Sequence, residues 1–300
     1  MRKFFLFGLL ISMFLPVFPG GGNAAAAGET AERCNYILIF QATEYNSKMG
    51  DAIDFFFNKI LKPEDHLSVI TPANPYNFPP QTRQAYPIEK LIERTNEVLK
   101  RDISVGVANY QQILDGMAQV VREMSGGVDL SGGADNTTPS DIKSNLIQYR
   151  QLKENLRSLR KLNENLFMQL AGLFKKETGK NYLYIFYQKE LRIIPNRNAL
   201  QRLKENMQFK ADAVELFEEE SDEKFMDVDA VSLALKDASV TLNFIYLNKD
   251  DTRKGTMETK EFSGDVYNVL SQLATATGGL IEATSKPEAV LKKWSTPPKK

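Results

Sequence analysis

Polar side chains follow two apolar runs of the sequence, and their types are those that bind hard cations. Residues 35–40 are followed by a polar segment at 41–47, and residues 182–187 are followed by another at 188–190. Hydroxyl, amide and carboxylate oxygens are the ligands that Mg²⁺ and Ca²⁺ prefer. The candidate ligands among these segments and a later loop are Thr43, Glu44, Asn46, Ser47 and either Thr137 or Thr138.

The two polar segments would meet at one edge of a sheet if the apolar runs are neighbouring parallel strands. Doubly wound sheets bind ligands at that edge, outside the carboxyl ends of the strands. We therefore expect a binding surface there, and we call its residues the predicted crest. The simpler interpretation of Thr43 and Ser47 is that they cap the following helix. The predicted crest comprises Gln41, Thr43, Glu44, Asn46, Ser47, Thr138 and Gln188.

Enzyme signatures are missing from the sequence. It contains no Gly-x-Gly-x-x-Gly dinucleotide turn, no Gly-x-x-x-x-Gly-Lys-Ser/Thr phosphate loop and no Gly-x-Ser-x-Gly elbow. We expect a protein that is not an enzyme and carries no cofactor. One alternative is an enzyme with an unfamiliar site built on Glu44, Asp65 and His66. Another is a metal site formed by Glu44, Ser47 and Thr138.

Composition narrows the class of partner. The 300 residues include 38 basic and 38 acidic side chains, so the formal net charge is zero. A dedicated nucleic-acid binder needs a basic surface, and none is indicated here. A single Cys excludes an intrachain disulfide and a cysteine-based zinc site, and a single His leaves little for a histidine metal centre. A protein partner is the remaining expectation.

The order of the expected elements predicts an α/β fold. Apolar runs at 35–40, 67–71, 182–187, 240–247 and 280–283 alternate with stretches of helical periodicity. Alternating strands and helices form a doubly wound, mostly parallel sheet flanked by helices. A long helical pair at 88–176, joined by a glycine-rich loop at 125–140, is inserted in the middle. Within it, 141–176 is predicted as one helix. Its leucine seam at 148–161, combined with many Lys, Arg and Glu residues, is favoured over the crest as the surface for a protein partner.

The N-terminal 27 residues are typical of a secretory signal peptide. Two basic residues precede an apolar stretch that is short for a membrane span, and small residues follow. We therefore expect cleavage, a periplasmic or secreted protein, and no integral membrane segment afterwards. The folded domain is predicted at 35–294 and a tail at 295–300.

Three segments resemble the von Willebrand factor type A (vWA) family. Residues 61–70 read Leu-Lys-Pro-Glu-Asp-His-Leu-Ser-Val-Ile, and residues 234–242 read Ala-Leu-Lys-Asp-Ala-Ser-Val-Thr-Leu. Residues 273–279 read Leu-Ala-Thr-Ala-Thr-Gly-Gly and resemble the family's Leu-Ala-x-x-Thr-Gly-Gly signature. The resemblance covers about 35–294 in the same order and implies the vWA fold.

The resemblance also implies where a metal site would lie. The family's metal-ion-dependent adhesion site uses Asp-x-Ser-x-Ser after the first strand and an Asp after the fourth. Here Gln41, Thr43 and Tyr45 occupy the first motif, and Gln188 and Lys189 lie near the late Asp. Both aspartates are missing, so the resemblance implies a degenerate metal site and a non-catalytic protein-interaction module.

Overall fold

The computed structural model builds a β-sheet from the apolar runs that were predicted as strands. The predicted signal peptide, Thr137, Thr138, most of the glycine-rich loop and the end of the tail lie outside the residues described. The structure describes residues 33–125, 139–160, 162–206, 208–218, 225–249, 253–254 and 257–296.

The described residues contain a six-stranded main sheet in the order β3-β2-β1-β4-β6-β9. Only β3 is antiparallel to its neighbour; the remaining pairs are parallel. This confirms the predicted α/β class and the five predicted strands. The strands are β1 (Cys34–Gln41), β2 (His66–Ile70), β3 (Pro75–Phe78), β4 (Lys180–Gln188), β6 (Val240–Leu247) and β9 (Ile281–Thr284).

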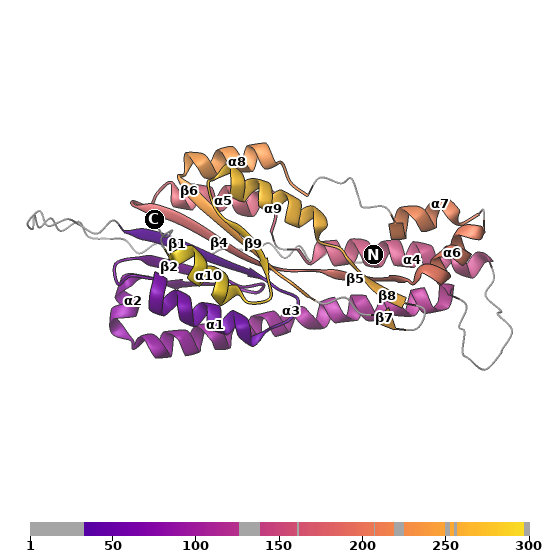
Figure 1. Ribbon diagram of the computed structural model, residues 1–300, viewed down its shortest axis with the longest axis horizontal. Helices are drawn as coiled ribbons and strands as arrows, with labels where there is room; N and C mark the ends of the chain where they lie inside the picture. The colour runs from indigo at the N-terminus through magenta and orange to yellow at the C-terminus, as the bar shows by residue number, and fades with distance from the viewer. Residues whose placement is uncertain are drawn as a thin grey trace, which may run out of the picture. The chain divides into compact units, whose positions relative to one another are not determined.

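Each face of the main sheet has its own core, because alternate side chains of a strand point to opposite faces. Leu38 and Phe40 pack beneath α1, α3 and α10, whereas Ile37 and Ile39 pack beneath α5, α8 and α9. Figure 1 shows these two sets of helices on opposite sides of the sheet. Their bounds are α1 (Ser47–Phe55), continued by the π-helical turn η1 (Phe56–Ile60), α3 (Ile88–Met124), α10 (Pro287–Ser295), α5 (Glu164–Phe174), α8 (Val228–Asp237) and α9 (Gly264–Ala276); the short α2 (Pro80–Ala85) follows β3.

A second, three-stranded sheet lies beside the second half of α3 in the described chain, in the order β5-β8-β7. Its helices and strands enclose a third core that includes Tyr110, Met117, Tyr149 and Phe217. This sheet was not predicted from the sequence. Its elements are β5 (Leu191–Pro195), β7 (Arg253–Lys254), β8 (Met257–Glu261), α4 (Pro139–Ser158), α6 (Arg197–Glu205), α7 (Lys210–Ala213) and η2 (Val214–Glu218).

The predicted single helix at 141–176 is wrong: it is divided into α4 and α5. Arg160 leaves the helical path to enter a buried cluster of charges, and Leu162 turns into the main core with 1% exposure. Asn163 then caps α5 by accepting a hydrogen bond from the Leu166 amide at 3.0 Å.

The leucine seam of α4 does not offer a free partner surface. Leu146 and Leu156 lie in the third core with Tyr149, opposite Val121 of α3 and Phe217 of η2. Burial of this stripe provides the packing that holds an amphipathic helix in place. The expectation that the seam at 148–161 binds a partner protein is therefore corrected.

Candidate functional site

The order of the main sheet reverses between β1 and β4. Strand β1 leads to β2 on one side, and β4 leads toward β6 on the other. In such a sheet the crevice outside the carboxyl ends of the two central strands is the usual ligand site. Gln41 and Tyr187 are register partners at this edge, so the segments that follow them converge as predicted.

The switch point between β1 and β4 is bridged by two residues of the predicted crest. The Gln188 side-chain oxygen accepts hydrogen bonds from the Thr43 amide at 2.9 Å and from the Thr43 hydroxyl at 3.0 Å. Gln188 is only 6% exposed and Gln41 8%. The oxygen of Gln188 that a ligand would meet is thus already engaged by the chain itself.

The remaining described crest residues face outward. Glu44 forms an ion pair with Lys249 at 3.0 Å, and its side chain is 61% exposed. Asn46 caps α1 by accepting a hydrogen bond from the Lys48 amide at 2.9 Å. The capping expected of Thr43 and Ser47 is therefore wrong; Asn46 is the N-cap, because its backbone is extended and its short amide side chain reaches the helix. Ser47 is exposed at the start of α1.

Tyr110 of α3 covers the same edge of the sheet. Its hydroxyl donates to the Leu191 carbonyl at 2.8 Å and accepts from the Leu191 amide at 2.9 Å. Burial raises the pKa of this hydroxyl, so it stays a neutral donor. The Lys249 ammonium lies 5.5 Å from the centre of its ring. Tyr110 therefore fixes the start of β5 directly beneath the crest.

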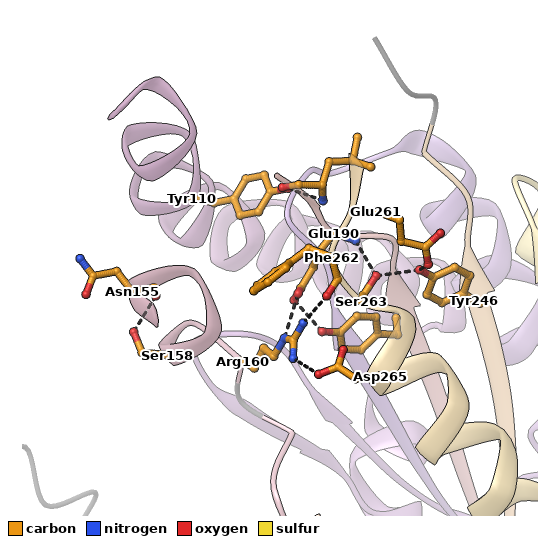
Figure 2. Close-up of polar contacts among 12 residues, drawn as sticks. Tyr110, Asn155, Ser158, Arg160, Glu190, Tyr246, Glu261, Phe262, Ser263 and Asp265 are labelled. Atoms are coloured by element: carbon orange, nitrogen blue, oxygen red, sulfur yellow. Dashed lines mark hydrogen bonds and ion pairs between the residues drawn. The ribbon is translucent and has the colours of Figure 1, made fainter. Parts of the chain in front are cut away.

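Arg160 lies at the centre of a buried charge cluster beside the crevice. Its guanidinium donates to Glu190 at 2.9 Å, to Asp265 at 2.7 Å and to the Phe262 carbonyl at 2.8 Å. The Tyr187 hydroxyl donates to the other Glu190 oxygen at 2.5 Å. Figure 2 shows the Arg160 fork pointing between the two carboxylates. The cluster joins the α4–α5 connection to the ends of both sheets.

A second chain of hydrogen bonds extends from this cluster toward the surface. The Glu190 amide donates to the Ser263 hydroxyl at 2.9 Å, and Ser263 lies 2.7 Å from the Tyr246 hydroxyl. Tyr246 donates to Glu261 at 2.6 Å (Figure 2). Lys189 lies 3.8 Å from the same carboxylate. The crest is therefore lined by polar groups that mostly satisfy one another.

The electrostatics of the cluster favour a structural role. Burial raises the pKa of the Glu190 carboxyl, and the Arg160 guanidinium opposes that shift. Burial also raises the pKa of the Tyr187 hydroxyl well above its ordinary value, so Tyr187 remains a neutral donor. Arg160 has only 5% of its side chain exposed, and its charge is engaged by two carboxylates. The arrangement holds the two sheets together and offers no activated nucleophile.

The residues at the crest do not fit a divalent cation. Within the described ranges no group of three or more His, Cys, Asp or Glu side chains is placed to hold a metal ion. The Gln188 oxygen is occupied by Thr43, and the Glu44 carboxylate is paired with Lys249. An amide and a hydroxyl that bind each other compete poorly with water for Mg²⁺.

The alternative catalytic group of Glu44, Asp65 and His66 is not brought together. His66 is the register partner of Asn35 at the amino end of β1, whereas Glu44 follows its carboxyl end. Six residues of extended strand separate those ends by about 20 Å. Asp65 is fully buried and accepts hydrogen bonds from the Cys34 and Lys62 amides, both at 2.8 Å. These hydrogen bonds hold the chain in place at the start of β2.

Several residues of the site were missed from the sequence. Arg160 was hidden inside a leucine pattern that continues across the break between α4 and α5. The signal that could have found the break is Asn163, a good N-cap residue within an apparently continuous helix. No local signal identifies the other missed residues, which belong to the site only through tertiary folding: Tyr110, Lys249, Glu261, Ser263 and Asp265.

The fold and the site together define an α/β protein with a doubly wound, mostly parallel sheet and a switch point bridged by its own side chains. No known family model and no curated protein matches this chain. One similar solved structure is the TFIIH p34 N-terminal domain, at 9% identity and a TM-score of 0.25, covering 88% of this chain and 96% of that one. A TM-score of this size does not establish a common fold. None of the described helices combines the length and apolar character that a membrane span requires.

Proposed function

We propose that the chain is a non-catalytic, exported protein-interaction module of the vWA type whose metal site lacks its aspartates. The observation that carries the proposal is the bridge between Gln188 and Thr43 at the switch point. It occupies the crevice where a doubly wound sheet would otherwise receive a small ligand. The resemblance at 61–70, 234–242 and 273–279 supports the vWA type, and the basic and apolar N-terminus supports export to the periplasm or outside the cell.

The outer surface of the crest is the proposed binding surface for the partner protein. Glu44, Asn46 and Ser47 are exposed there, beside the ammonium group of Lys249. The seam of α4 is excluded as a rival because it is buried in the third core. A rim of exposed charges steers association and fixes the orientation of a protein partner.

Charge reversal at Glu44 should weaken partner binding without unfolding the protein. The change Glu44→Lys places a second cation beside Lys249, and we expect the dissociation constant of the partner to rise about tenfold, or ~1.4 kcal/mol. The lost ion pair between Glu44 and Lys249 is exposed, so the free energy of unfolding should change by less than about 1 kcal/mol. The measurement is quantitative recovery of proteins on the tagged full chain, followed by titration of the recovered partner.

The matched control is Glu89→Lys, which reverses an exposed charge in the first turn of α3. We expect this variant to recover the partner as the unaltered chain does. Equal recovery by both variants and the unaltered chain would exclude the crest as the binding surface. Mass spectrometry of the mature N-terminus tests export separately, since a retained Met1 contradicts signal cleavage.

A further inference from the structure

Helices α5 and α8 lie side by side on one face of the main sheet and run in the same direction (Figure 1). At their amino ends, the Asp227 amide donates to the Glu164 carboxylate at 3.2 Å. At their carboxyl ends, the Lys175 ammonium lies 3.6 Å from the Asp237 carboxylate. These two contacts fix the register of the pair, so each turn of α5 can be assigned to a level of α8.

Two large apolar side chains are exposed on the outer surface of this helix pair. Met168 of α5 is 44% exposed, and Leu233 of α8 is 62% exposed. Met168 follows Glu164 by four residues, so it lies on the side of α5 that faces α8. The register places it beside the half-buried Ala230, one turn before Leu233. Met168, Ala230 and Leu233 therefore form one apolar surface, which we call the α5–α8 patch.

Charges of opposite sign flank the α5–α8 patch along the helix axes. The exposed acidic side chains at the amino ends are Glu164, Asp227 and Asp229. The exposed side chains at the carboxyl ends are Lys175, Lys176 and Lys236, together with Asp237. The helix from Glu164 to Lys175 is about 16 Å long, which exceeds the Debye length of about 8 Å at physiological ionic strength. The acidic end and the basic end therefore act as separate charges.

A surface with this arrangement is complementary to a second copy of itself. A two-fold axis that lies in the plane of the patch, perpendicular to the helices, places each acidic end over a basic end and brings the two apolar centres together. An axis parallel to the helices would instead place like charges opposite each other, which disfavours association. Charge complementarity therefore selects a second copy of this chain, with its helices antiparallel to those of the first.

We propose that the chain forms a two-fold dimer through the α5–α8 patch. Met168 and Leu233 of both copies form the apolar centre, and Asp229 of each copy faces Lys236 of the other. Four large apolar side chains are few for a permanent dimer, so we expect a transient dimer with a dissociation constant in the micromolar range. The patch belongs to the helical layer and not to the crest, so this dimer goes beyond the proposed function and does not depend on it.

Sedimentation equilibrium of the full chain at increasing protein concentration tests the dimer. We expect the unaltered chain to shift from monomer to dimer, and Leu233→Glu to raise the dissociation constant by at least about tenfold, because it places two carboxylates in the apolar centre. The matched control is Val105→Glu in α3, which is 64% exposed and outside the patch, and it should dimerise like the unaltered chain. A monomer at every concentration, a dimer that persists in Leu233→Glu, or equal loss in the control overturns the proposal.

Exchange of charges across the two-fold axis gives a second test, which unfolding of a variant cannot imitate. Asp229→Lys places two lysines opposite each other, and Lys236→Glu places two carboxylates opposite each other. Each variant alone should raise the dissociation constant by at least about tenfold. An equimolar mixture of the two variants should restore the dimer, because every such pair then joins opposite charges. Failure of the mixture to associate more tightly than either variant alone would contradict the two-fold arrangement and overturn the proposal.

Discussion

Replacing Arg160 by Met should lower the free energy of unfolding by about 3–5 kcal/mol. The change keeps much of the side-chain volume but removes the cation between Glu190 and Asp265. Glu190 is 4% exposed, so its carboxylate would be buried without its main partner. Urea unfolding followed by the fluorescence of Trp294, which packs against the core beneath α1, measures the loss.

The same variant should become less stable as the pH rises. Without Arg160, burial remains the largest influence on Glu190 and raises its folded pKa above the unfolded value, although the hydrogen bond from Tyr187 opposes the shift. The folded chain then binds more protons than the unfolded chain, so stability is greatest below the unfolded pKa and falls as the pH rises through the folded pKa. Unfolding curves between pH 4.5 and 8 test the sign.

A double variant separates loss of the ion pair from damage to the fold. Combining Arg160→Met with Glu190→Gln removes the isolated charge, while the amide oxygen can still accept from Tyr187. We expect this pair of changes to recover about 2 kcal/mol relative to Arg160→Met alone. A single-variant loss below about 1 kcal/mol, or no recovery in the double variant, would contradict a cluster held by its charges.

The main sheet could be predicted because its strands are buried on both faces. All eight residues of β1 are buried, and the sequence shows this as a nearly continuous apolar run. The second sheet gave no such signal. Strand β8 reads Met-Glu-Thr-Lys-Glu and β5 has Arg192 in its interior, so neither has the alternation of a half-buried strand. Their pairing depends on contacts between residues far apart in the sequence.

Only the part of the candidate site that lies directly at the ends of predicted strands could be predicted from the sequence. The convergence of Thr43 with Gln188 follows from the parallel register of β1 and β4, which the sequence implies. Tyr110 and Arg160 come from the inserted segment, and its return to the sheet edge is a tertiary contact. The leucine period continues without interruption across the α4–α5 connection and therefore predicts a continuous helix. In such a helix Arg160 would be one more residue of the polar face, so its place in the buried cluster could not be predicted.

Replacing Gly279 by Ala should lower the free energy of unfolding by about 3 kcal/mol or more. A Cβ atom at this position would lie 1.7 Å from the Leu242 carbonyl oxygen of β6, so backbone must move. The surrounding contacts oppose that movement: the Leu242 amide donates to the Thr277 hydroxyl at 3.1 Å, and the Leu280 amide donates to Asn243 at 3.0 Å. The close approach explains the second glycine of the Thr-Gly-Gly segment.

The matched control is Gly172→Ala in α5, where an added Cβ meets nothing within 4 Å. An exposed helical glycine loses stability through backbone entropy, so this change should stabilise the protein by about 0.5–1 kcal/mol. Opposite signs for the same chemical change would locate the effect in the contact with β6. Both changes in the free energy of unfolding are measured with urea at one pH. Equal changes in the two variants would show that the backbone between α9 and β9 can shift without loss of stability, and that this contact does not fix the last strand.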